Sequence, residues 1–298
     1  APITDVTTFD LSDDSSGRLT LSATYTGAVT VLLSKGLRAT HGTDTDETTN
    51  TDSVVNTAGV ALTVEATNAA IDSGTTLTGG AGIDTLILYA DDSGATADFT
   101  AVTKFETITV TDNTLSAGDD AALDLKAYAT PLTVDASSLD ALETVNIDGD
   151  SMTAAGILTA TGGGGTDTID GGAGNDVISG GGSADTLDGN GGLDNISGGA
   201  GNDSILVHNE GQFVTAAGYE TVDGGAGTDT LTFDTAAVAL SAAEIANISN
   251  VEVLSLYTGS SITVNDAFLT DNPGISIRLA GNGTLSGGTD SAGGALTT

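Results

Sequence analysis

The stretch from Gly162 to Leu206 repeats one nine-residue pattern five times without a gap. The copies read GGGGTDTID (162–170), GGAGNDVIS (171–179), GGGSADTLD (180–188), GNGGLDNIS (189–197) and GGAGNDSIL (198–206). Each copy begins with glycines, has Asp at its sixth place and has a branched apolar residue at its eighth place. Because glycine permits tight turns and the branched residue favours a strand, each copy predicts a turn followed by a short strand.

The combination of glycine-rich turns and regularly spaced Asp residues indicates calcium binding. Calcium takes roughly six to eight oxygen ligands, and a single turn with one carboxylate cannot supply them. Two stacked turns can supply them from their carboxylates and backbone carbonyls. A flexible Gly/Ser linker is the alternative interpretation, but the aliphatic residue in register through all five copies argues against it.

The five copies resemble the repeats-in-toxin (RTX) nonapeptide G-G-x-G-x-D-x-U-x, whose members form calcium-binding parallel β-rolls. The resemblance implies that two copies make one coil, so that Asp residues two copies apart share an edge and clamp an ion between them. One edge would carry Asp167, Asp185 and Asp203, and the other Asp176 and Asp194. The carbonyls of the first, third and fifth places would complete the shells. These implied ligands are Gly162, Gly164, Thr166, Gly171, Ala173, Asn175, Gly180, Gly182, Ala184, Gly189, Gly191, Leu193, Gly198, Ala200 and Asn202.

Two positions depart from the nonapeptide pattern, and two further motifs resemble it. Ser183 and Asn190 replace glycine at the fourth and second places, which puts the geometry of those turns in question. Residues 224–232 form another copy, whose Asp229 lies 26 residues after Asp203 instead of 18. One enlarged coil would keep these two Asp residues on one edge and allow a fourth ion there. Asp84, in a similar motif at 79–89, is a candidate for a separate calcium site.

The motifs at 79–89 and 224–233 each run into a full strand, and a matched strand follows at 105–110 and 251–256. Recurrence of this unit predicts an all-β chain: a right-handed parallel β-solenoid with a central roll and wider coils on either side. The expected segments are an N-terminal strand region (1–78), a β-solenoid (79–160), the calcium-binding roll (161–235) and C-terminal solenoid coils with a frayed end (236–298). A capping box at Ser241–Glu244 predicts one short helix.

The charge balance restricts the partners, since 41 acidic residues face 6 basic ones for a net charge of −35. Nucleic acid is not expected as a partner, because phosphate binding needs a basic surface. Dense negative charge opposes compaction and favours metal as part of the fold. The absence of cysteine excludes disulfides and fits a secreted protein of a bacterial surface that uses calcium instead. No apolar run reaches the length of a membrane span. The start at Ala1 does not open a signal peptide, which suggests a mature chain or a fragment.

No catalytic motif is present, so the sequence predicts a protein that is not an enzyme. The first hypothesis is a calcium-dependent structural subunit of an S-layer or extracellular filament, because the composition resembles RTX-bearing S-layer proteins. Its expected partners are further copies of itself and a cell-surface polysaccharide. The alternative is a segment of a large secreted adhesin. A third hypothesis is the repeat part of a secreted enzyme. The acidic run Thr40–Ser53 is interpreted as a solvated loop, with a further metal site as its alternative.

Overall fold

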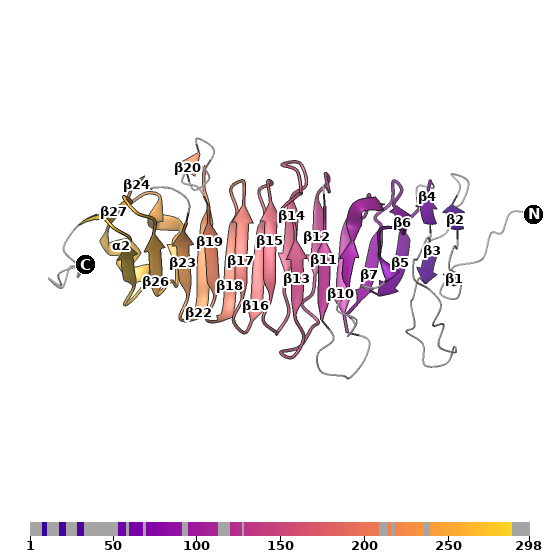
Figure 1. Ribbon diagram of the computed structural model, residues 1–298, viewed down its shortest axis with the longest axis horizontal. Helices are drawn as coiled ribbons and strands as arrows, with labels where there is room; N and C mark the ends of the chain where they lie inside the picture. The colour runs from indigo at the N-terminus through magenta and orange to yellow at the C-terminus, as the bar shows by residue number, and fades with distance from the viewer. Residues whose placement is uncertain are drawn as a thin grey trace, which may run out of the picture.

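The computed structural model of the chain is a rod of stacked coils, with the first and last described strands, residues 8–10 and 284–287, toward opposite ends (Figure 1). It describes residues 8–10, 18–21, 29–32, 53–57, 60–67, 70–90, 95–112, 120–126, 128–208, 214–215, 218–234 and 239–287. The acidic run from Thr40, except Ser53, lies outside these residues, as does His41.

Two long parallel sheets form the opposite walls of the rod. The first has 11 strands in the order β1 (Thr8–Asp10), β3 (Val29–Leu32), β5 (Leu62–Thr67), β7 (Thr85–Tyr89), β10 (Thr107–Thr111), β12 (Leu132–Asp135), β14 (Leu158–Thr161), β16 (Val177–Gly182), β18 (Asn195–Gly201), β22 (Thr221–Gly227) and β25 (Ile248–Ser249). The second has nine in the order β28 (Ser276–Leu279), β26 (Val253–Leu256), β23 (Thr230–Phe233), β19 (Ser204–Val207), β17 (Thr186–Asn190), β15 (Thr168–Gly172), β13 (Val145–Asp148), β11 (Ala121–Asp124) and β8 (Thr96–Asp98).

Smaller sheets and short helices complete the ends. A third sheet joins β2 (Arg18–Leu21), β4 (Ser53–Asn56), β6 (Thr76–Thr78) and β9 (Val102–Thr103), and a fourth joins β24 (Ala239–Leu240), β27 (Ser261–Val264) and β29 (Thr284–Gly287). An antiparallel pair, β20 (Val214–Thr215) and β21 (Gly218–Tyr219), projects from the rod. The helical segments are η2 (Phe99–Ala101), η3 (Ile245–Asn247) and α2 (Asp266–Asp271).

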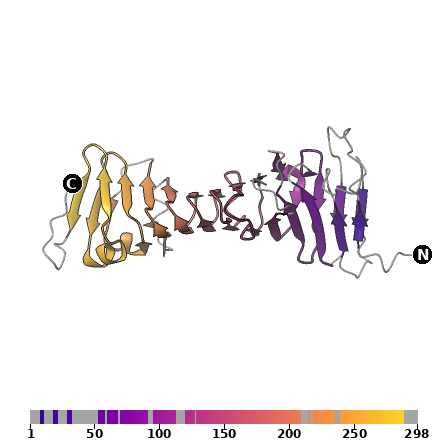
Figure 2. The ribbon, with the colours of Figure 1, turned by 90° about the horizontal axis from the view of Figure 1, so that it is seen from below.

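The predicted parallel β-solenoid is confirmed, and the register gives the length of each coil. In the roll Ile178 pairs with Ile196, and Ile169 with Leu187, so one coil takes 18 residues, or two nonapeptides. Outside the roll the coils are longer, as the pairing of Leu231 with Leu254 shows. The rod is accordingly narrow in its middle and wider at both ends (Figure 2).

The thin interior is filled by the eighth places of the repeat. These aliphatic side chains are at most 1% exposed. They are Ile169, Ile178, Leu187, Ile196, Ile205, Val222 and Leu231. The first sheet crosses all three expected segment boundaries and the second crosses the last two, so the four segments are stretches of one solenoid, and their exact limits stay predictions.

The capping box forms only in part. The backbone N–H of Ser241 donates to Glu244 Oε2, and a single 3-10 turn, η3, follows. The tail expected to be frayed continues in register as β29, which pairs with β27 up to Gly287. A short α-helix that the sequence did not single out, α2, begins where Asn265 Oδ1 accepts a hydrogen bond from the Phe268 N–H at 2.9 Å.

Candidate metal centre

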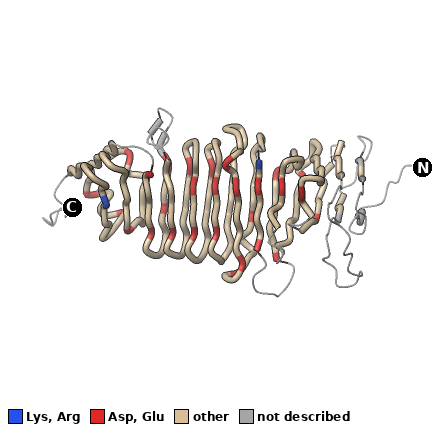
Figure 3. Tube along the Cα trace, viewed as in Figure 1, with Lys and Arg blue, Asp and Glu red and all other residues tan. Residues whose placement is uncertain are grey.

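The sixth-place acidic residues form two rows along the edges of the roll. The first row is a ladder in which each backbone N–H donates to the carboxylate of the next coil. Asp167 donates to Asp185 Oδ1 at 2.8 Å, Asp185 to Asp203 Oδ1 at 2.9 Å, and Asp203 to Asp229 Oδ1 at 2.8 Å. The last step spans the enlarged coil, so Asp203 and Asp229 do share one edge. Figure 3 shows acidic residues recurring in successive coils.

The second row contains Asp176 and Asp194, as expected, and a residue that the sequence analysis missed. The N–H of Leu158 donates to Asp176 Oδ1 and that of Asp176 to Asp194 Oδ1, both at 2.7 Å. Because Asn195 pairs with Thr221, Glu220 lies one coil beyond Asp194 at the same place. Residues 215–223, TAAGYETVD, are therefore a degenerate copy with Gly at the fourth place, Glu at the sixth and Val at the eighth. An insertion at 207–214 had hidden it.

Six carboxylates of the two rows each have one oxygen that no polar group of the described residues satisfies. Each of these residues is at most 2% exposed, and the buried atom has no hydrogen-bond partner. The atoms are Asp176 Oδ2, Asp185 Oδ2, Asp194 Oδ2, Asp203 Oδ2, Asp229 Oδ2 and Glu220 Oε2. A buried carboxylate oxygen without a donor costs free energy unless a cation approaches it. The donor set therefore fits a hard divalent cation.

The first-place glycines show where these oxygens point. A Cβ built on Gly180 would lie 2.3 Å from Asp185 Oδ2 and 2.6 Å from the carbonyl oxygen of Gly198. A Cβ on Gly198 would likewise lie 2.4 Å from Asp203 Oδ2 and 2.3 Å from the oxygen of Gly224. A carboxylate oxygen and a first-place carbonyl of the next coil thus converge beside each glycine. Calcium bound to such oxygens would neutralise the buried charge and join successive coils.

Two predicted ligands, Asp84 and Asp167, have a different environment. Asp84 Oδ1 accepts from the Leu62 N–H at 2.7 Å, and its Oδ2 accepts from the Gly80 N–H. Asp167 Oδ1 accepts from Val145 at 2.8 Å and Oδ2 from Gly163 at 2.7 Å. Backbone donors thus satisfy both oxygens of each carboxylate. Their role as metal ligands stays a prediction, as do the third-place and fifth-place carbonyls.

The ladders end on glutamates from the matched strands. The N–H of Asp229 donates to Glu252 Oε2, and that of Asp84 to Glu106 Oε2, both at 2.8 Å. Glu252 thus ends the first Asp row with a side-chain acceptor, and Glu106 has the same place relative to the single Asp84.

The two departures from the glycine pattern are accommodated by the backbone. Second-place glycines such as Gly181 have positive φ, 110° in this case, and Asn190 at the same place has φ of 58°. Ser183, at a fourth place, has φ of 66° and its hydroxyl donates to the Gly164 carbonyl at 2.7 Å. Asn is one of the few non-glycine residues that readily adopts this conformation.

Burial changes the titration of the two rows. It raises the pKa of Asp176 to about 6 and that of Asp185 and Asp194 to about 7. Burial, followed by the charges of Asp194 and Asp188, raises the pKa of Glu220 to about 8. Without metal, full deprotonation of these carboxyls is therefore unfavourable. A bound divalent cation would stabilise their charged form.

The ninth place follows the inward-facing eighth place, which predicts that Asp170 and Asp188 face solvent; for Asp188 this prediction is wrong. Asp188 is only 7% exposed, and its Oδ2 contacts His208 Nε2. His208 Nδ1 lies 2.9 Å from Asp234 Oδ1, so the imidazole bridges two carboxylates. Burial opposes the charge of His208, but the hydrogen bond to Asp234 and the charge of Asp188 outweigh it and raise its pKa. Asp170 is half-buried.

No group of three or more His, Asp or Glu side chains among the described residues is placed to hold a metal by itself. This agrees with a row geometry, in which each coil contributes one carboxylate per edge and the backbone must supply the remaining oxygens. In the described part of the chain, no helix is long and apolar enough to cross a membrane.

The family model of the RTX calcium-binding nonapeptide repeat matches residues 161–195, 188–206 and 216–234 of this chain. The predicted RTX repeats are therefore confirmed, and this part of the chain is a calcium-binding repeat region. The match at 216–234 includes Glu220 and most of the degenerate copy. No curated protein and no solved structure matches the chain.

Proposed function

We propose that the protein is a calcium-dependent structural subunit of a bacterial surface layer or extracellular filament. The observation that carries this proposal is the continuity of the rod. Two parallel sheets of 11 and nine strands run through the calcium-binding roll and the wider coils on both sides. Ions bound in the roll would therefore stiffen the centre of one elongated body. Such a body is suited to span distance and to pack side by side.

The charge distribution supports calcium as the agent of both folding and assembly. Calcium in the roll offsets only part of the net charge of −35, and two rods with this charge repel each other. Lateral contact would then use further calcium between acidic edges of neighbouring copies. RTX repeat proteins are typically secreted, and the external medium is where calcium is abundant. These features support a cell-surface location.

The proposal includes no catalytic role for this chain. An RTX β-solenoid is typically a structural repeat region. Of the two histidines, His41 lies outside the described residues, and His208 is held between Asp188 and Asp234. Nucleic acid is not proposed as a partner, because only 6 basic residues face 41 acidic ones and phosphate binding needs a basic surface.

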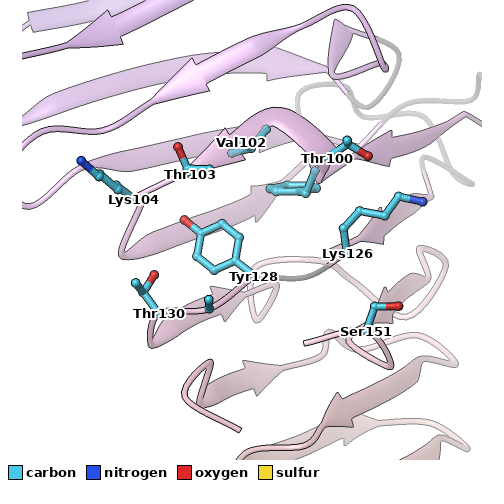
Figure 4. Close-up of a pocket in the computed structure, with 10 residues that line it drawn as sticks. Thr100, Val102, Thr103, Lys104, Lys126, Tyr128, Thr130 and Ser151 are labelled. Carbon is cyan, nitrogen blue, oxygen red and sulfur yellow. The ribbon is translucent and has the colours of Figure 1, made fainter. Parts of the chain in front are cut away.

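A pocket in the wider N-terminal coils favours the alternative function, a glycan-binding adhesin (Figure 4). Its volume is about 480 Å³. Lys104 and Lys126 lie on either side of Tyr128, and the lining also contains the apolar Phe99, Val102 and Ala129 and four hydroxyl side chains. These are Thr100, Thr103, Thr130 and Ser151. Such a lining suits an acidic sugar of a cell-surface polysaccharide. Asp124 contacts Lys126 Nζ, however, and the Tyr128 hydroxyl is occupied by Phe105, to whose carbonyl it donates at 2.7 Å.

Electron microscopy of the full chain with and without millimolar calcium tests the proposal. We expect sheets or filaments with calcium and dispersed particles in chelator. Folded monomers at every calcium concentration, together with retention on an acidic polysaccharide, would favour the adhesin instead. In that case Lys104→Ala should abolish the retention, and Arg278→Ala, at the other end of the rod, should leave it unchanged.

A further inference from the structure

The coil that contains the insertion at 207–214 has a sixth-place acidic residue on each edge of the roll. Only on the first edge is that residue the Asp of the nonapeptide pattern. On the first edge Asp203 and Asp229 continue the ladder. On the second edge the register of β18 with β22 places Glu220 next to Asp194. The sixth place of this copy is therefore occupied, although by a longer side chain than in the other copies.

Glu220 has the same signature as the Asp residues of the roll. Glu220 is only 2% exposed, and its Oε2 has no hydrogen-bond partner. Asp194 is also 2% exposed, and its Oδ2 is without a partner. Two buried carboxylates at the same place of adjacent coils thus each have one oxygen without a partner.

No cation of the described chain neutralises this pair. His208 is committed to Asp188 and Asp234, and Asp188 adds to the negative charge that acts on both Glu220 and Asp194. Protonation of both acids would remove the charge but would bring no partner from any other described residue. A bound divalent cation would neutralise the charge of the pair and coordinate the two oxygens that lack partners.

From this geometry we infer an additional calcium site between Asp194 and Glu220, at the end of the second edge. This inference rests on the proposed calcium-dependent fold. It extends that proposal to a copy in which Glu replaces the sixth-place Asp. The second row would then hold two ions, between Asp176 and Asp194 and between Asp194 and Glu220. The site would join the two coils on either side of the insertion at 207–214, where the chain leaves the nine-residue rhythm.

The test is to count calcium ions bound to the full chain at saturating calcium by equilibrium dialysis and atomic emission. Glu220→Gln removes the charge and keeps the size, so it should bind one ion fewer than the wild type. Glu244→Gln, at η3 outside the roll, is the matched control and should bind the wild-type number. An unchanged ion number in folded Glu220→Gln overturns the inference.

Glu220→Asp keeps a carboxylate on a shorter arm and covers the case in which Glu220→Gln does not fold. One ion should then bind with altered affinity while the others are unchanged, and an isotherm identical to that of the wild type contradicts the site. The outcome also separates the two proposals. A wild-type chain that binds no calcium refutes the proposed function, whereas equal ion counts in wild type and Glu220→Gln refute the additional site alone.

Discussion

Individual Asp residues of the roll are not equivalent, because their positions in the rows differ. Asp185 has a stacked carboxylate on each side, Asp167 and Asp203, whereas Asp176 has one only on the Asp194 side. A carboxylate between two neighbours can contribute to two ions, and one at the end of a row to a single ion. The consequences of substitution should follow this difference.

We therefore predict that Asp185→Asn lowers the bound calcium by about two ions per chain and Asp176→Asn by about one. Titration calorimetry on the full chain measures both. Asp266→Asn, on the exposed first turn of α2, is the control and should leave binding unchanged. Equal losses for the two roll variants would contradict the stacking of turns two copies apart.

The raised pKa values of the row predict opposite effects of pH with and without calcium. Burial raises the pKa of Asp185 and Asp194 from 3.8 to about 7. A carboxyl whose pKa is higher in the folded chain stabilises the fold while it is protonated. This contribution is complete below about pH 4 and is lost as the pH rises through about 7. Calcium, in contrast, needs the deprotonated carboxylates.

In chelator, the full chain should thus melt at a lower temperature at pH 8 than at pH 5. In millimolar calcium the order should reverse. Thermal melts followed by circular dichroism measure both, and Asp185→Asn should reduce the pH dependence in chelator. A melting temperature that increases with pH in chelator would show that burial does not control these groups.

At the scale of the turn, glycine is required at some places of the repeat and not at others. Gly192, at a fourth place, has φ of 140°, and a Cβ there would lie 1.6 Å from the Gly174 carbonyl oxygen of the coil before. At the third place Ala173 and Ala200 occur naturally. The fourth-place glycine therefore permits the close stacking of turns, and the third place has room for a methyl group.

We predict that Gly192→Ala destabilises the calcium-loaded roll by more than about 2 kcal/mol, since it combines a steric clash with an unfavourable φ. Gly182→Ala, at a third place, should cost less than about 1 kcal/mol. Urea unfolding in calcium compares the two. Similar losses for both would mean that the turns relax where the structure shows contact.

The sequence was most informative where the repeat is strict. Asp and aliphatic residues in register from 162 to 206 were enough to predict the coil, its interior and both acidic edges. The copy at 215–223 was missed because Glu replaces Asp and the first three places have no glycine. The signal that could have revealed it is the spacing of 26 residues, which is one coil of 18 plus an insertion of eight, followed by Gly218 and Val222 in phase.

Long-range contacts account for the other differences. The burial of Asp188 depends on His208, a residue of the following coil, and no local pattern indicates that pair. Likewise both oxygens of Asp84 are satisfied by Leu62 and Gly80, and the first of these belongs to another coil. The motif around Asp84 resembles the one around Asp229, yet only Asp229 has an oxygen without a partner. Local sequence therefore predicts the turn, whereas contacts with the neighbouring coil determine whether the Asp has an oxygen free to bind metal.

At the scale of the whole molecule, folding and assembly should need different amounts of calcium. About four ions in the roll offset about eight of the 35 negative charges, so the folded rod remains strongly anionic. Sites inside the roll bring buried oxygens together, whereas contacts between rods would use exposed carboxylates with weaker affinity. Monovalent salt screens such repulsion but cannot bridge two carboxylates.

We therefore predict two separate transitions when calcium is added to the metal-free full chain. Circular dichroism should report folding at the lower concentration, and light scattering should report assembly at a higher one. Sodium chloride at equal ionic strength should produce neither transition. Asp185→Asn should shift the folding transition to higher calcium, because it removes a ligand shared by two sites. Assembly that accompanies folding at one midpoint, or that salt alone induces, would show that contacts other than calcium bridges join the rods.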